Sequence, residues 1–123
     1  MYHNSNSKVQ NPIFCHTFLR QRHNALPTFF QNYFTAYFQR PVDVNVISVD
    51  YSNLVKEPCY FQAVENADVV AKCTSQFLEK LLKIRQDIDL RQIHIIGLSL
   101  GAQVAGQISN YFTLGQIERI TGW

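Results

Sequence analysis

The stretch QIHIIGLSLGAQVAG, residues 92–106, decides the fold of this chain. Its first five residues are almost continuously apolar, which predicts a buried strand over residues 92–96. Four apolar positions then follow at helical spacing and predict an amphipathic helix: Leu100, Val104, Ile108 and Tyr111. The sequence Gly97-Leu98-Ser99-Leu100-Gly101 lies where the strand meets the helix. The stretch therefore predicts a strand that turns sharply into a helix, with a serine at the turn.

Two glycines flank Ser99 and make such a turn sterically feasible. The residues two before and two after the serine of a sharp strand-to-helix turn pass very close to neighbouring backbone, where only a residue without a Cβ fits. Gly97 and Gly101 occupy those positions. The turn would project the Ser99 hydroxyl at the carboxyl edge of the sheet, and the helix start would place the Leu100 N–H beside a developing oxyanion. We interpret this G-x-S-x-G sequence as a nucleophile elbow.

A glycine-rich turn of a nucleotide-binding sheet is an alternative interpretation. The glycines at positions 97, 101 and 106 do not match the G-x-G-x-x-G spacing, and no Lys-Ser or Lys-Thr pair follows to form a P-loop. A membrane Gly-x-x-x-Gly contact is excluded because the flanking residues do not form a long apolar segment. A small nucleotide-binding module therefore stays open only as a third hypothesis.

Strand and helix patterns alternate on both sides of this stretch. Further strands are predicted at residues 12–15, 42–50 and 117–120. A long amphipathic helix is predicted over residues 63–84, after a loop at 51–59. The apolar residues expected on its inner face are Val64, Ala67, Val70, Ala71, Phe77, Leu78, Leu81 and Leu82. Another helix is predicted from Leu26-Pro27 to a stop at Pro41, with an aromatic stripe expected to pack in the core: Phe30, Tyr33, Phe34, Tyr37 and Phe38.

The resulting order is β-α-β-α-β-α-β, which indicates the α/β class. Helices of this length between strands form crossover connections, so we expect a mostly parallel, doubly wound sheet. Ligands bind such sheets at the carboxyl edge of the strands, where Ser99 is expected. We expect one domain over residues 12–123, preceded by a disordered or extended segment over residues 1–11.

Composition excludes several classes of function. The chain has 123 residues, 46% of them hydrophobic, and a formal net charge of +2 with its charges scattered. That charge is too small for a nucleic-acid-binding surface or a polybasic membrane anchor. No apolar run approaches the ~20 residues of a membrane helix, and residues 1–8 lack the apolar core of a signal peptide.

Three cysteines, Cys15, Cys59 and Cys73, leave two interpretations open. Their spacing contains no CxxC pair, so a zinc site has little support, and Cys15 is expected in the core. Cys59 and Cys73 either form a bridge from the loop to the long helix, which would require an oxidising compartment, or are two small buried side chains.

The chain resembles the pancreatic-lipase-like branch of the α/β-hydrolases, especially secreted insect lipases and phospholipase A1-like members. The resemblance covers most of the chain from Pro12 onward. It rests on four segments: VNVISVDYS at 44–52, Tyr60-x-x-Ala63-x-x-Asn66, IHIIGLSLGAQVAG at 93–106 and RITG at 119–122. Leu98 differs from the His or Phe that usually precedes the serine in this family.

The resemblance implies a partial α/β-hydrolase fold and a lipase or phospholipase A1 activity on lipid esters. It implies that Ser99 is the nucleophile, that the N–H groups of Leu100 and Phe18 form the oxyanion hole, and that Cys59 pairs with Cys73. Thr17 stands where the family has a glycine, and a β-branched residue fits badly if that position needs a positive φ. The resemblance implies an extracellular location and peripheral contact with a lipid interface. It implies neither a metal nor an organic cofactor.

The residues that would activate Ser99 are absent from this sequence. A serine hydroxyl needs a histidine base oriented by an acid, and α/β-hydrolases place both after the serine. No histidine follows Ser99, and Glu118, expected to be a solvated surface charge, is the only later acid. His94 is expected to be a packed or an edge residue of the strand before Ser99. We therefore expect an amino-terminal fragment of a catalytic domain, inactive alone; a non-catalytic lipid-binding or yolk-type storage protein is the alternative.

Overall fold

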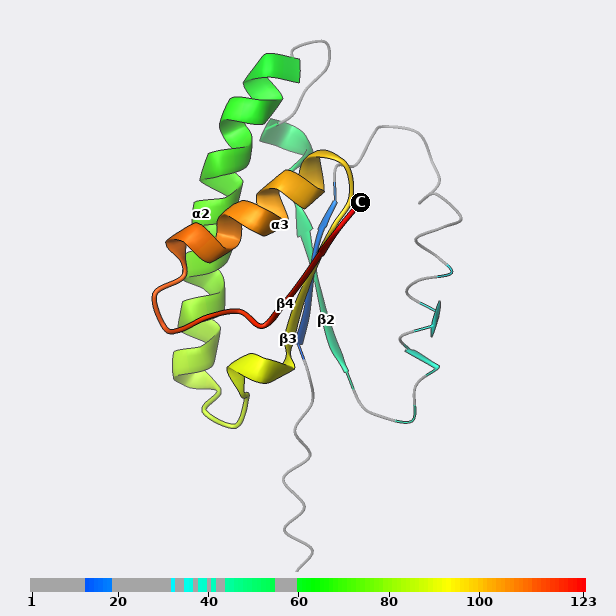
Figure 1. Cartoon of the computed structure of the whole chain (residues 1–123), viewed down its shortest axis with the longest axis vertical. Helices are drawn as coiled ribbons and strands as arrows, with labels where there is room; N and C mark the ends of the chain where they lie inside the picture. The colour runs from blue at the N-terminus through cyan, green and yellow to red at the C-terminus, as the bar shows by residue number, and fades with distance from the viewer. Residues whose placement is uncertain are drawn as a thin grey trace, which may run out of the picture.

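The computed structural model describes residues 13–18, 44–54 and 60–123, together with isolated positions at 32, 35–36, 38–39 and 41. Its sheet has four strands: β1 (Ile13–Phe18), β2 (Asn45–Asp50), β3 (Ile93–Gly97) and β4 (Arg119–Gly122). Their order across the sheet is β2-β1-β3-β4, and every neighbouring pair is parallel (Figure 1). The predicted parallel sheet is thus present in the described part of the chain.

Two long helices cover one face of this sheet. Helix α2 (Tyr60–Ile84) follows the short 3-10 turn η1 (Ser52–Leu54), and helix α3 (Leu100–Tyr111) follows β3 directly, so both lie on the same side in Figure 1. The helix predicted between β1 and β2 falls mainly outside the described residues. The complete β-α order and a helix layer on the second face therefore stay predictions, as do the bounds of the predicted domain.

The strand order places β1 and β3 at the point where the chain reverses direction across the sheet. The chain passes from β1 outward to β2, and then crosses back to β3 and β4 on the other side of β1. Because the two connections lead away in opposite directions, the carboxyl ends of β1 and β3 border the crevice where open parallel sheets bind ligands. Thr17 of β1 lies opposite Gly97 of β3 at this edge.

The core lies between the sheet and the two helices. Small residues line the buried side of α2, where Ala67 and Ala71 are almost fully buried, and Ala105 of α3 is equally buried. Small side chains at such positions let helix axes approach closely. Larger apolar side chains complete the cluster: Tyr51, Val70, Leu78, Ile93, Ile95, Leu100, Val104, Ile108, Phe112 and Ile117.

Three aromatic or aliphatic residues expected in the core are exposed instead. Phe77 and Val64 belong to the apolar pattern of α2, yet they are 48% and 44% exposed. Phe77 lies off the face that carries Ala67, Ala71 and Leu78, whereas Val64 shares that face but lies near the start of the helix. Phe38 is 64% exposed, so the expected core packing is wrong for this residue. The other members of its aromatic stripe lie outside the described residues.

Polar contacts join α2 to the end of α3. The Glu79 carboxylate accepts hydrogen bonds from the backbone N–H (2.6 Å) and the hydroxyl (2.7 Å) of Thr113. These bonds lower the pKa of Glu79, the side-chain bond most. The Tyr111 hydroxyl donates to Asp68, and this bond raises the pKa of Tyr111. These bonds hold the two helices together where the apolar contact between them ends.

A capping box precedes β3 and fixes where the strand begins. The 3-10 turn η2 (Leu90–Gln92) is capped by Asp89, whose carboxylate accepts from the Arg91 N–H at 2.9 Å while the Gln92 side chain accepts from the Asp89 N–H. The Arg91 guanidinium also donates to Asp89 at 2.6 Å. The side-chain bond from Arg91 is the main reason that the pKa of Asp89 falls to about 2.

We predict that Asp89 titrates near pH 2 in the folded chain. Because its ordinary pKa is 3.8, the stabilisation by this cap is complete above about pH 4 and is lost as the pH falls toward 2. The carboxyl carbon chemical shift of Asp89, followed by NMR through an acid titration, measures this directly. A midpoint close to 3.8 would show that Asp89 does not accept the hydrogen bonds from Arg91.

Candidate functional site

The turn between β3 and α3 holds Ser99 in a strained backbone conformation. Ser99 has φ 53° and ψ −121°, and it is the one residue other than glycine with a positive φ in the described part of the chain. Such conformations cost about 1–3 kcal/mol and persist only where the surroundings hold them. The strand, turn and helix around Ser99 follow one another without intervening residues, as the sequence predicts.

Close backbone packing explains the glycine at position 97. A Cβ placed on Gly97 would lie 2.1 Å from the Gly101 carbonyl oxygen and 2.7 Å from the Ala102 nitrogen. Both neighbours are backbone atoms at the start of α3, so no side-chain rotation could relieve the overlap. The first turn of the helix therefore crosses the end of β3 at a distance that only glycine permits.

The Ser99 side chain lies at the surface and does not cap the helix. Serine is a preferred N-cap residue, since its hydroxyl ordinarily accepts from a backbone N–H of the first helical turn. Ser99 occupies the N-cap position of α3 and is exposed, yet its side chain makes no capping bond. Its backbone carbonyl instead accepts from the Ala102 N–H at 2.9 Å. This leaves the hydroxyl available for a reaction at the surface.

The first N–H groups of α3 provide a positive end beside Ser99. A helix leaves its first N–H groups without partners inside the helix, and these carry the positive end of its dipole. Leu100 is the first residue of α3, and no hydrogen bond from its N–H is found within the described part of the chain. If Ser99 Oγ attacked a carbonyl carbon, the negative charge that develops on the carbonyl oxygen would lie next to this N–H.

The residue after β4 is hydrogen-bonded to both sides of the turn, a contact that the sequence patterns did not predict. The Ser99 N–H donates to the Trp123 carbonyl at 2.6 Å, and the Trp123 N–H donates to the Gly97 carbonyl at 3.1 Å. Gly122 passes against helix α3, because a Cβ on it would lie 2.8 Å from the Ala102 Cβ. No local sequence pattern predicts this contact, because it depends on β4 lying next to β3 in the sheet.

The end of β1 lies at the same edge of the sheet. Phe18 is the last residue of β1 and pairs with Asp50 of β2, while Thr17 pairs with Gly97, two residues before Ser99. Thr17 lies within the strand, where β-branched residues are favoured, and it is not among the residues with positive φ. The proposed role of the Phe18 N–H as a second oxyanion donor stays a prediction.

The described acid and base candidates are a buried histidine, a buried tyrosine and an exposed glutamate. His94 is 4% exposed and its Nε2 lies 2.8 Å from Thr121 Oγ1, as expected of a packed strand residue. Burial raises the pKa of Tyr51, at the end of β2, to about 12, so its phenol stays protonated at neutral pH. Glu118 is exposed, as predicted. Within the described residues, no cluster of side chains could hold a metal ion.

The predicted disulfide lies partly outside the described residues. Cys73 is exposed on α2 and pairs with no other cysteine in the described part of the chain, whereas Cys59 is not among the residues described. The alternative in which Cys73 is a small buried side chain is therefore wrong. The pairing of Cys59 with Cys73 stays a prediction.

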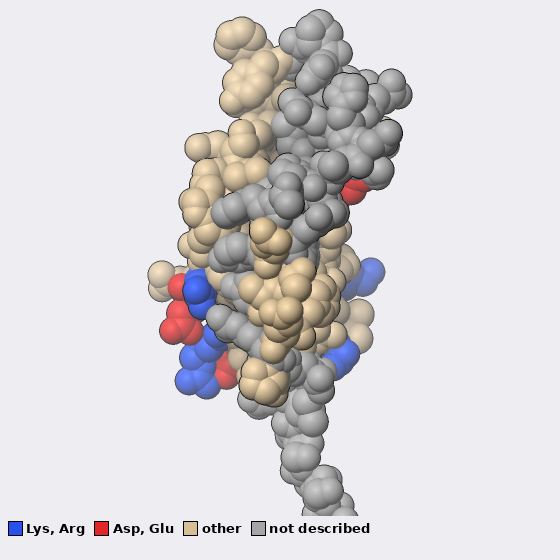
Figure 2. All heavy atoms as spheres, turned by 90° about the vertical axis from the view of Figure 1, so that its right-hand side faces the viewer, with Lys and Arg blue, Asp and Glu red and all other residues tan. Residues whose placement is uncertain are grey.

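The described charged side chains can be followed on one face of the molecule. Figure 2 shows a face on which the described Lys, Arg, Asp and Glu side chains lie mostly toward the margins, with both signs mixed. None of the described helices is both long enough and apolar enough to cross a membrane.

In this parallel sheet, the strained, exposed serine between strand and helix lies on the kind of turn on which α/β-hydrolases carry their nucleophile. A family model described as Lipase matches residues 2–123. The chain belongs to this lipase family.

Known proteins support the same assignment. The chain is 42% identical over 91 residues to phospholipase A1 member A of Rattus norvegicus, covering 74% of this chain and 19% of the relative. It is 39% identical over 84 residues to a putative endothelial lipase of Crotalus adamanteus (68% and 16%) and 33% identical over 95 residues to lipase member H of Danio rerio (77% and 20%). The chain thus spans about a fifth of the length of these relatives.

We predict opposite effects of alanine at two glycines of this region. Gly97→Ala would force its Cβ against backbone and lower the free energy of unfolding by about 3 kcal/mol or more. Gly106→Ala, in the middle of α3, meets no atom within 4 Å and should raise it by about 0.5–1 kcal/mol through helix propensity. Urea unfolding of both variants measures this, and a stable Gly97→Ala protein would refute the close crossing.

Proposed function

We propose that this chain carries the nucleophile of a carboxylic ester hydrolase of the lipase or phospholipase A1 type, and that Ser99 is that nucleophile. The observation that carries the proposal is the exposed Ser99 side chain, held at positive φ and not used as a helix cap, at the carboxyl edge of a parallel sheet. Membership of the lipase family supports the choice of ester hydrolysis over other acyl-transfer reactions.

The proposed reaction has two steps. Ser99 Oγ attacks the ester carbonyl carbon, its proton passes to a base, and the alcohol leaves with a proton from that base to give an acyl-serine. Water then attacks the acyl-serine while its proton passes to the same base. The bond to Ser99 Oγ breaks, Oγ takes that proton back, and the acid is released. The Leu100 N–H, and the Phe18 N–H as second donor, stabilise the negative oxygen in each tetrahedral intermediate. Neither step needs a metal or an organic cofactor.

The base and its orienting acid are assigned to residues that this sequence does not contain. His3, His16, His23 and His94 all precede Ser99, whereas the acid and then the histidine follow the serine along an α/β-hydrolase chain. His94 is buried against Thr121. The proposal therefore describes the nucleophile and oxyanion half of a site.

Exposed apolar side chains near this edge support lipid esters as the substrate class. α2 begins at the end of the molecule where β3 passes into α3 (Figure 1). Its first residues Tyr60 and Phe61 are 65% and 86% exposed, and Leu54 of η1 is also exposed. We propose that these side chains touch the lipid aggregate that presents the ester. We also place the protein outside the cell, where the predicted Cys59–Cys73 bridge would be stable.

We predict that Ser99 is essential when this chain is given a complete triad. Replacing the matching segment of the rat phospholipase A1 member A with this chain should give a hybrid that hydrolyses p-nitrophenyl butyrate and reacts with a fluorophosphonate probe at Ser99. Ser99→Ala should lower kcat by about 10⁶-fold, because it removes the nucleophile. Ser109→Ala, the same change at an exposed serine of α3, should leave kcat unchanged.

The 123-residue chain alone supplies the second arm of this experiment. It should not turn over p-nitrophenyl butyrate measurably, since it lacks the downstream histidine. Turnover by the chain alone that Ser99→Ala abolishes would contradict the assignment of the base to other residues. A folded, active hybrid that keeps its activity after Ser99→Ala would refute Ser99 as the nucleophile.

We predict that Phe61 contributes to adsorption on lipid. Phe61→Ser should weaken binding of the chain to phosphatidylcholine vesicles by about tenfold or more, because the variant lacks the phenyl group whose transfer from water into the lipid favours binding. Phe77→Ser is the matched control, since Phe77 is exposed on the same helix roughly 24 Å along its axis. Vesicle co-sedimentation measures both, and equal losses would argue against a contact localised to the start of α2.

A further inference from the structure

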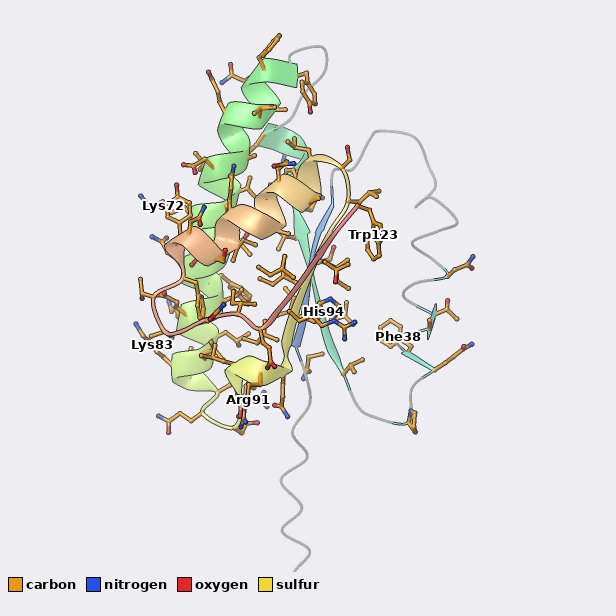
Figure 3. The ribbon with its side chains drawn as sticks, in the orientation of Figure 1. Phe38, Lys72, Lys83, Arg91, His94 and Trp123 are labelled. Atoms are coloured by element: carbon orange, nitrogen blue, oxygen red, sulfur yellow. The ribbon has the colours of Figure 1, made fainter. Side chains whose placement is uncertain are left out.

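A side-chain hydrogen bond joins β3 to the edge strand β4, and both strands lead to the Ser99 turn. His94 Nε2 of β3 and Thr121 Oγ1 of β4 are 2.8 Å apart, and His94 is 4% exposed. Figure 3 shows His94 on the side of the sheet away from α2 and α3. Ile96, on the same face of β3, is also buried and packs with Val44 and Val46. Separating this pair removes a hydrogen bond from His94, which is buried, while Thr121 is half-buried on the edge strand.

The bond runs diagonally between the strands and so resists sliding of β4. In the register of the sheet, His94 lies opposite Arg119, while Thr121 lies opposite Ile96. His94 therefore reaches the residue two positions farther along β4 than its own partner. Backbone pairing between strands is periodic, whereas this side-chain bond forms in one register only. It holds the carboxyl half of a strand that has just four residues.

The same half-strand holds the turn that presents Ser99. Thr121 is two residues before Trp123, whose carbonyl accepts the Ser99 N–H and whose N–H donates to Gly97. Gly122, between them, packs against Ala102 of α3. A strained turn keeps its conformation only if its neighbours hold it, and Trp123 is one of those neighbours. Displacing the end of β4 would release the Ser99 N–H from its acceptor.

We propose that His94 and Thr121 are positioning residues for Ser99. Their hydrogen bond fixes the position of the end of β4, and the Trp123 backbone then holds the backbone of Ser99 through its hydrogen bonds. A role of this hydrogen bond in catalysis rests on the proposed function. Its effect on the backbone conformation of Ser99 does not, because that effect is independent of the reactivity of the hydroxyl.

Amide hydrogen exchange of the full 123-residue chain tests the coupling. Thr121→Val keeps the shape and β-branching of the side chain but removes the hydroxyl, and Thr121→Ser keeps the hydroxyl. In Thr121→Val, the Ser99 and Trp123 amides should exchange about five- to tenfold faster, as expected for loss of one buried hydrogen bond. Thr121→Ser should match the wild type. The Val104 amide, inside α3, should exchange at the wild-type rate in both variants.

A second variant breaks the same bond from the other strand. His94→Phe retains a buried ring but has no ring nitrogen, and it should accelerate Ser99 and Trp123 exchange as Thr121→Val does. The proposal is overturned if Ser99 exchange is unchanged in a folded variant, if Val104 accelerates equally, or if Thr121→Ser behaves like Thr121→Val. The proposal is also overturned if Thr121→Val and His94→Phe both fail to fold while Thr121→Ser folds. The bond would then be needed to fold the whole sheet and not to position Ser99 alone. Ser99→Ala kinetics test the nucleophile separately.

Discussion

The close crossing of β3 by the first turn of α3 is the constraint from which the other features of this structure follow. At this crossing the Gly101 carbonyl occupies the space that a Cβ of Gly97 would need. Because the helix starts so near the strand, the chain must reverse within two residues, and Ser99 takes up the strain at positive φ. The same sharp reversal leaves its side chain outside the helix and at the surface. A larger residue at position 97 would open the turn and remove all of these consequences together.

Two sets of contacts oppose that strain from different directions. From the helix side, the Gly101 and Ala102 N–H groups donate to the carbonyls of Leu98 and Ser99. From the sheet side, Trp123 bonds both Gly97 and Ser99 through its backbone. The parallel order of the strands makes the second set possible, since β4 runs in the same direction as β3 and ends beside the turn. The sheet thus supplies both the edge at which a substrate would bind and the support for the serine.

Local sequence patterns predicted the elements around Ser99 well because the relevant interactions are short in sequence. The continuous apolar run before Gly97 and the helical spacing after Leu100 each specify one element by themselves. The same reasoning failed for Val64 and Phe77. A helical repeat shows which residues share a face, but it does not show how far packing extends around the helix or toward its end. Phe77 lies off the buried face of α2, and Val64 lies on that face but near the start of the helix, so both side chains are exposed.

By itself, the sequence determined the parallel α/β pattern, the turn at Ser99 and the need for glycine at position 97, because these depend on periodicity and on the volume of one missing Cβ. Only the tertiary structure decided that Trp123 holds Ser99, that His94 bonds Thr121 and that Cys73 is exposed. Those facts depend on which strand lies next to β3 and in which register. Partners in a sheet are separated by many residues along the chain, and no local pattern specifies the distance between them.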